Sequence, residues 1–129
     1  MKELTPPSIR PPFARYAHGV EIPAEWRIVQ TSGQLGIRPD DTIPDSAFEQ
    51  ATVCFKNIAA ILKDAGLEPK DTAHITAYVT DRAHMAGYMQ ARDAFIGATD
   101  RLPSSTLLIV SGFTKEEFKV EVEVMAAAP

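Results

Sequence analysis

The chain of 129 residues is 45% hydrophobic and 23% charged, the proportions of a globular protein long enough to bury one core. Its formal net charge of −4 gives no general attraction for nucleic acid, so nucleic-acid binding is not expected. One cysteine and three scattered histidines offer neither a disulfide nor a metal-ligand spacing, and no apolar run has the length of a signal peptide or a membrane span. We therefore expect one soluble, cytoplasmic domain over residues 1–129, without a metal and not bound to a membrane.

The first strands are predicted from β-forming residues that follow a proline-rich start. Four prolines within residues 1–14 fix φ and remove N–H donors, which predicts an extended arm. β-Formers are dense over residues 16–22 and 26–31, and Pro23 lies in the short connection between them. These two stretches are therefore expected to pair as a hairpin.

Two amphipathic helices are predicted, and each is followed by a glycine that can end it. Ser46 lies three residues before Glu49, the pattern of a capping box, and apolar residues then recur at spacings of three and four up to about Ala65. The second helix is expected over residues 83–96. Its inner stripe is predicted to be Met85, Tyr88, Met89, Arg92, Phe95 and Ile96.

The remaining strands are predicted over residues 73–80, 106–110 and 118–125, which gives the order ββαβαββ. This order indicates an α+β fold in which a mixed sheet carries both helices on one face. The other face would be half apolar if it were bare. We therefore expect a partner subunit to cover that face.

The last strand alternates strictly, with valines on one face and Lys119, Glu121, Glu123 and Met125 on the other. The valines are expected to face the helices. A glutamate on the opposite face is either an ordinary solvated residue or, once a partner covers it, a carboxylate of raised pKa that can act as a general acid or base.

Other polar segments are weaker candidates for a site. Ser32-Gly33-Gln34, at the expected end of the second strand, either presents backbone groups to a ligand or forms an ordinary turn. Ser104-Ser105-Thr106 either supplies hydroxyl and amide donors or caps a loop. The histidines are interpreted as structural and Cys54 as an inert core thiol. The sequence has no P-loop, no dinucleotide-binding glycine run and no Ser-His-Asp pattern.

Three segments together resemble the RidA/YjgF family of enamine and imine deaminases: residues 16–20 (Tyr-Ala-His-Gly-Val), 31–34 (Thr-Ser-Gly-Gln) and 119–123 (Lys-Val-Glu-Val-Glu). The similarity extends over about residues 12–126. It implies a chorismate-mutase-like homotrimer, with the sheets packed into a central barrel, the helices outside and three clefts between neighbouring subunits. It also implies hydrolysis of 2-imino acids to 2-keto acids and ammonia, with no metal or cofactor taking part.

The resemblance assigns roles to five residues. Glu121 matches the glutamate that positions the attacking water, and Tyr16 matches a tyrosine of the cleft. Thr106 matches a small residue that offers its backbone amide. Ser32 and Gly33 match the Ser-Gly turn of the family.

Two positions depart from the family pattern. Ser104 stands where active deaminases have an arginine that clamps the substrate carboxylate, and Met89 stands where some members have an asparagine in the cleft. A charge-assisted arginine contact contributes roughly 1.5–3 kcal/mol, so its loss predicts about ten- to a hundredfold weaker recognition of an anionic imino acid. Either the substrate lacks that carboxylate or another arginine reaches the cleft. Arg15 and then Arg101 are the candidates, and the alternative for both is an ordinary surface position.

These observations lead to three hypotheses about function. The first is a hydrolase, a deaminase of a small imine or enamine, acting in a cleft between subunits on a substrate altered by the change at Ser104. The second is a homologue that binds a small molecule without catalysis, for which Ser104 and Met89 are the evidence. The third, a ribonuclease or translation inhibitor, is disfavoured by the acidic composition.

Overall fold

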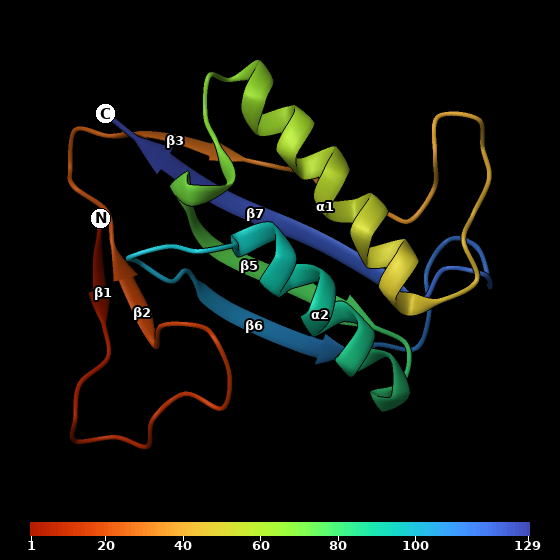
Figure 1. Ribbon diagram of the computed structural model, residues 1–129, viewed down its shortest axis with the longest axis horizontal. Helices are drawn as coiled ribbons and strands as arrows, with labels where there is room; N and C mark the ends of the chain where they lie inside the picture. The colour runs from red at the N-terminus through yellow and green to blue at the C-terminus, as the bar shows by residue number, and fades with distance from the viewer.

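A mixed β-sheet forms the centre of the molecule, which a computed structural model describes over residues 1–129. Its strands lie in the order β3 (Arg27–Gln30), β7 (Val120–Ala128), β5 (Thr72–Val79) and β6 (Ser104–Ile109) (Figure 1). Strand β4 (Gln34–Leu35) pairs with the first part of β7. Only β5 and β6 are parallel. The connection between them contains the second helix, as a parallel pair requires.

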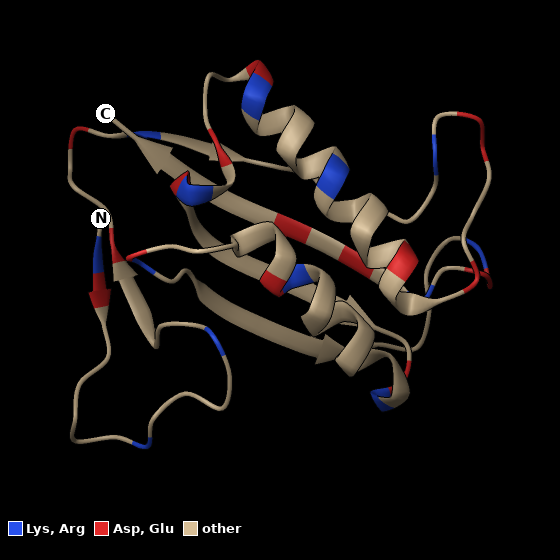
Figure 2. Ribbon diagram, in the orientation of Figure 1, with Lys and Arg blue, Asp and Glu red and all other residues tan.

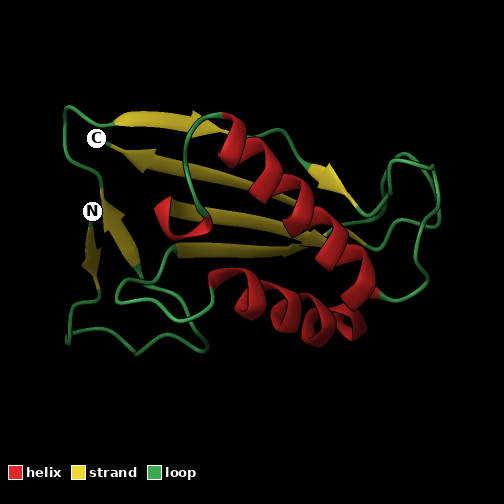
Figure 3. Cartoon of the chain, turned by 45° about the horizontal axis from the view of Figure 1, so that its top comes forward, coloured by secondary structure: helices red, strands yellow, loops and turns green.

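Both helices lie on the same face of this sheet (Figure 3). Helix α1 (Ala47–Asp64) begins at Ser46, whose hydroxyl accepts a hydrogen bond from the backbone N–H of Glu49. Helix α2 (Met85–Ile96) follows the short 3₁₀ turn η2 (Arg82–His84), and a second such turn, η1 (Pro69–Asp71), precedes β5. Glycines at positive φ follow both helices, at +74° for Gly66 and +62° for Gly97. The predicted α+β fold with both helices on one face is confirmed, and neither helix is long and apolar enough to cross a membrane.

The core lies between the two helices and the sheet. Val120, Val122 and Val124 of β7 are buried beneath α1, as the alternation predicted. Cys54 of α1 is buried in the same cluster, and burial raises the pKa of its thiol to about 12. A thiol that stays protonated is a poor nucleophile, in agreement with a structural role for Cys54.

A buried glutamine ties α1 to the loop that precedes it and to the loop that precedes β7. The side-chain amide of Gln50 donates to the carbonyl oxygens of Pro44 and Glu117, both at 2.8 Å. Its oxygen accepts from the N–H of Lys119 at 2.8 Å. These three bonds fix the chain just before β7 begins, so they position the residues of β7 that follow.

The predicted hairpin of residues 16–22 and 26–31 does not form. Strand β2 (Gly19–Glu21) instead pairs with β1 (Lys2–Leu4) in a separate two-stranded sheet, so regular structure begins within the arm that was expected to be merely extended. Strand β3 pairs with β7. Since Pro23 has no N–H to give to a ladder, β2 and β3 separate at this point and each pairs with a distant strand.

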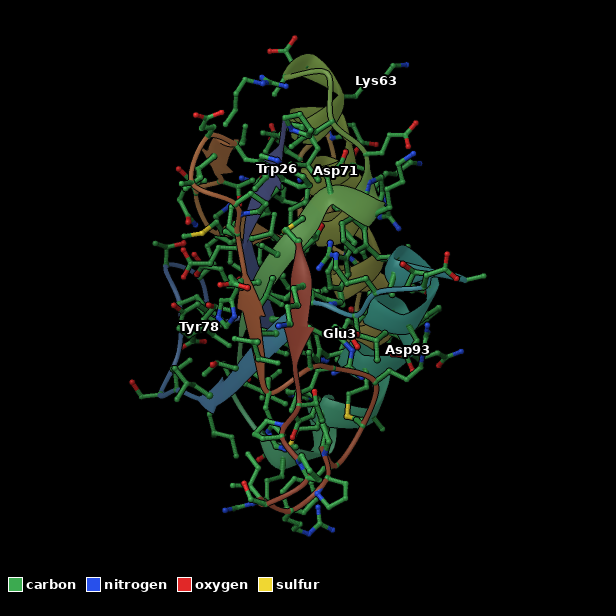
Figure 4. The ribbon with its side chains drawn as sticks, turned by 90° about the vertical axis from the view of Figure 1, so that its left-hand side faces the viewer. Glu3, Trp26, Lys63, Asp71, Tyr78 and Asp93 are labelled. Carbon is green, nitrogen blue, oxygen red and sulfur yellow. The ribbon has the colours of Figure 1, made fainter.

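The face of the sheet away from the helices is open and partly apolar. Tyr78 of β5 projects on this side, opposite the helices and Asp93 (Figure 4). On the same face Ile28 is 58% exposed and Leu108 of β6 is 46% exposed. Strand β6 ends the sheet, and its outer edge is bridged only at Ser104, by Ala17.

Candidate active site

Glu121 lies on the open face, against the Ser32-Gly33 turn. It pairs with Tyr78 of β5 on one side and with Leu35 of β4 on the other. A Cβ atom added to Gly33 would fall 1.9 Å from Oε1 of Glu121, so the carboxylate packs directly on the glycine backbone. The structure therefore brings together Ser32, Gly33 and Glu121, three residues to which the resemblance assigns roles. The side chain of Ser32 is exposed.

Thr31 holds this turn in place. Its N–H donates to the carbonyl oxygen of Val124 at 3.0 Å, and its hydroxyl accepts from the N–H of Val124 at 3.0 Å. The ladder between β3 and β7 is thereby extended by one residue, and the chain then turns away at Ser32 before it rejoins β7 as β4. Glycine at position 33 leaves room for the carboxylate of Glu121, which any side chain there would displace.

The two glutamates of β7, seen as acidic bands along the strand in Figure 2, have different surroundings. The hydroxyl of Tyr78 donates to Oε1 of Glu123 at 2.6 Å, and this hydrogen bond raises the pKa of Tyr78. The carboxylate of Glu121 accepts no hydrogen bond from the protein. Burial, and then the charge of Glu123, raise the pKa of Glu121. Of the two, Glu121 is the carboxylate free to accept a proton from water.

Ser104, the first residue of β6, is hydrogen-bonded to a histidine. Its hydroxyl lies 2.7 Å from Nδ1 of His74, the residue beside it on β5, and it also donates to the carbonyl oxygen of Ala73 at 3.2 Å. Burial lowers the pKa of His74, so the ring is neutral at pH 7. Thr106 is exposed on the same face, two residues along β6. Ser104 and His74 thus form a neutral, hydrogen-bonded pair of side chains at the start of β6.

Tyr16 and Met89 meet on the other side of β6, in a cavity of about 410 Å³ between α2 and residues 13–16. Tyr16 is half-buried, and its hydroxyl accepts from the N–H of Phe13 at 3.2 Å. Ser105 also lines this cavity, since its side chain points to the helix side while those of its neighbours on β6 point to the open face.

Both arginines that the resemblance suggests as substitute clamps donate to backbone carbonyl oxygens, although the buried Nη1 of Arg101 makes no hydrogen bond. Arg15 donates to the carbonyl oxygen of Gly97 at 2.7 Å and to that of Asp93 at 3.5 Å, so it caps the C-terminus of α2. Arg101 donates from Nη2 to the carbonyl oxygens of Lys70 and Thr72, both at 2.9 Å. Each of these guanidinium groups is used to join elements of the fold.

The candidate residues of one chain therefore fall into separate groups. Strand β5 separates β6 from β7, so Thr106 lies two strand spacings, about 10 Å, from Glu123 and farther than that from Glu121. Tyr16 and Met89 are on the opposite face of β6 from Thr106. No cluster of histidine, cysteine, aspartate and glutamate in the chain could hold a metal ion.

Comparison with known proteins places this arrangement in a family. A family model described as Endoribonuclease L-PSP matches residues 8–128. The chain belongs to the RidA/YjgF family. The family resemblance deduced from the sequence is thereby confirmed.

Within the RidA/YjgF family, the chain is 35% identical over 82 residues to a RutC family protein of Aquifex aeolicus, a match that covers 63% of each chain. It is 28% identical over 126 residues to the 2-iminobutanoate/2-iminopropanoate deaminase of Escherichia coli K12, which covers 96% of this chain and 92% of that protein. The Rid family protein YyfB of Yersinia pestis, described as of unknown function, has the same fold, with a TM-score of 0.85 at 22% identity over 98% of both chains.

Three residues of this RidA/YjgF chain were not recognised as candidates from the sequence. Tyr78 hydrogen-bonds to Glu123, and His74 hydrogen-bonds to Ser104. The strand alternation, which places Tyr78 and His74 on the open face, was the sequence signal that could have identified them. Arg92 was predicted to lie on the inner stripe of α2, and it lines the same cavity as Tyr16 and Met89. A charged residue on an apolar stripe was the signal that it serves a purpose beyond packing.

Proposed function

We propose that the protein hydrolyses a small imine or enamine to a carbonyl compound and ammonia, with Glu121 as the general base. The observation that carries this proposal is the carboxylate of Glu121, which lies on the backbone of Gly33, accepts no hydrogen bond and has a raised pKa. A partly desolvated carboxylate beside open space is suited to hold and deprotonate a water molecule.

The reaction proceeds in two stages. The water oxygen bonds to the C=N carbon while Glu121 takes one water proton and passes it to the imine nitrogen, which gives a carbinolamine. The carbinolamine then collapses: Glu121 takes the hydroxyl proton as the carbonyl forms and passes it to the leaving nitrogen, the C–N bond breaks, and ammonia leaves. One water is consumed, no electrons are exchanged and the carboxylate is restored.

The site is proposed to be assembled from two copies of the chain in a homotrimer. Within one protomer, Glu121 with Ser32 and Gly33 lies near β4, whereas Thr106 and Tyr16 lie near the opposite edge of the sheet. A small substrate cannot span the more than about 10 Å between these groups. The exposed apolar residues of the open face supply a surface for a second copy to cover.

The experiment compares Glu121→Gln with Glu123→Gln, using imines generated in situ with and without an α-carboxylate and measuring ammonia release. Loss of a general base predicts about a 10²-fold or greater fall in turnover for Glu121→Gln. Glu123 already accepts from Tyr78, so Glu123→Gln is expected to change turnover less. Light scattering on each variant checks the trimer. Equal small effects of the two changes, or a monomer at micromolar concentration, would refute the proposal.

A second candidate function, binding of a small molecule without turnover, is favoured by one observation. The Ser104 hydroxyl is bonded to His74 and Ala73, and Ser104 supplies no cation at the position that the resemblance assigns to a substrate-clamping arginine. Ammonia release no faster with the protein than without it, together with measurable binding of a keto acid, would favour this function. Ribonuclease activity, suggested by the description of the family model, would require salt-dependent RNA binding by an acidic chain.

A further inference from the structure

The cavity between α2, residues 13–16 and β6 has apolar walls and a single buried cation. Phe13, Met85, Met89 and Leu107 supply most of its lining, and Tyr16 closes one side. Its volume of about 410 Å³ lies within the usual range for a small-molecule site. Arg92, Ser105 and Tyr16 are the lining residues whose side chains carry polar N or O atoms.

Arg92 is unusually short of partners for a buried arginine. It is only 4% exposed, and its Nε and Nη2 atoms donate to the same carboxylate oxygen of Asp93, at 3.2 and 3.1 Å. Nη1 makes no hydrogen bond, although a guanidinium carries five N–H donors. The Asp93 side chain is 41% exposed, so water weakens the one ion pair that Arg92 has. Burying a charge this deeply is costly unless further acceptors complete its shell.

A second polar group nearby also lacks a partner. Tyr88 is fully buried, and its hydroxyl, which has Ser105 as its polar neighbour, makes no hydrogen bond of good geometry. Burial raises the pKa of Tyr88 to about 12, so the hydroxyl keeps its proton. Buried donors without acceptors are rare in folded proteins. Tyr88 does not line the cavity, whereas Arg92 does, so an acceptor that enters the cavity would be available to the unpaired Nη1 of Arg92.

We propose that this cavity binds a small carboxylate with an apolar side chain, whose carboxylate pairs with Arg92 and whose side chain lies against Met85, Met89 and Leu107. A carboxylate supplies the acceptors that the guanidinium lacks, and an apolar body matches the walls. The corresponding substrate of the reaction is a 2-imino acid with a branched or aromatic side chain, and this part of the inference rests on the proposed function. The binding itself is independent of Glu121.

The assignment also accounts for the change at Ser104. The serine, which is bonded to a neutral His74, cannot neutralise a carboxylate, whereas Arg92 offers a full charge on the other side of the same strand. Arg15 and Arg101 are held by backbone carbonyls and do not line the cavity. Arg92 is therefore the arginine available to select an anion.

The test is calorimetric titration of the intact protein with 4-methyl-2-oxopentanoate and with the ketone 4-methyl-2-pentanone, which has a methyl group in place of the carboxylate. We expect tighter binding of the acid. Arg92→Met should weaken binding of the acid by about ten- to a hundredfold and leave binding of the ketone unchanged. Arg82→Met is the matched control: Arg82 is exposed, makes no side-chain hydrogen bond and carries the same charge, so this variant should bind both compounds normally.

A second variant, which fills the cavity, tests the inference even if Arg92→Met fails to fold. Met89→Trp keeps the charge of Arg92 but occupies the space, so binding of both compounds should be lost, with the fold checked by thermal unfolding. Equal binding of acid and ketone by the wild type, the same loss in Arg82→Met, or normal binding by Met89→Trp would overturn the inference. Glu121→Gln should bind the acid normally, so failure of catalysis and failure of this site are told apart.

Discussion

Gly33→Ala is a test of the site that alters no charged or polar side chain. The added methyl carbon would lie 1.9 Å from Oε1 of Glu121 and 2.8 Å from its Cδ. To reach an ordinary contact of 3.4 Å or more, the carboxylate must retreat by about 1.5 Å. Since a displacement of roughly 1 Å can cost about 10²-fold in rate, we expect turnover to fall by about that factor or more.

Stability should be affected far less than rate by this substitution. Gly33 has no positive φ, so alanine adds no backbone strain, and the atom that must move is the end of a flexible side chain. The assay is ammonia release from imines generated in situ, with thermal unfolding measured in parallel. Gly112→Ala is the control, because nothing lies within 4 Å of the Cβ it would add. A Gly33→Ala protein with wild-type turnover would mean that the position of Glu121 does not matter.

Three further outcomes are expected. Burial raises the pKa of Glu121, so the folded protein holds this proton more tightly than the unfolded chain. The resulting stability is complete below the unfolded pKa of about 4.3 and is lost as the pH rises through the folded pKa. Glu121→Gln should therefore unfold at a higher temperature than the wild type near pH 7 and at the same temperature near pH 4, and a temperature difference that does not change with pH would contradict this. Ser104→Arg should raise ammonia release from the imine of pyruvate, and no gain would show that the missing clamp is not what limits this substrate. Gln50→Leu leaves the Lys119 N–H without its acceptor, which should lower the free energy of unfolding by about 1–3 kcal/mol in urea titrations, whereas an unchanged midpoint would show that water replaces the amide.

The helices and the last strand could be predicted because their signals are local. The Ser46 cap, the glycine after each helix and the alternation of β7 each depend on residues a few positions apart, and the structure places all of them as expected. The sides of β7 followed from the same alternation, which put Glu121 on the open face.

Strand pairing was harder to predict because the partners are distant in sequence. Residues 16–22 and 26–31 have the composition of a hairpin, but the choice of partner depends on residues 2–4 and 120–128, whose competing ladders no local pattern reveals. The short strand β4 gave no periodicity to detect. The cavity of Arg92 was missed for a similar reason, since it forms only where α2, β6 and residues 13–16 converge.

The open edge of β6 has a consequence for handling the protein. Leu108 and Ile109 are both 46% exposed, and beyond Ser104 no strand covers their outer edge. An uncovered apolar edge can add strands from other chains without a defined end, which leads to aggregates. The proposed homotrimer and precipitation would therefore compete for one surface. A soluble monomer is best sought with a charge placed on that edge, as in Leu108→Lys, since merely weakening the interface would leave the edge free to aggregate.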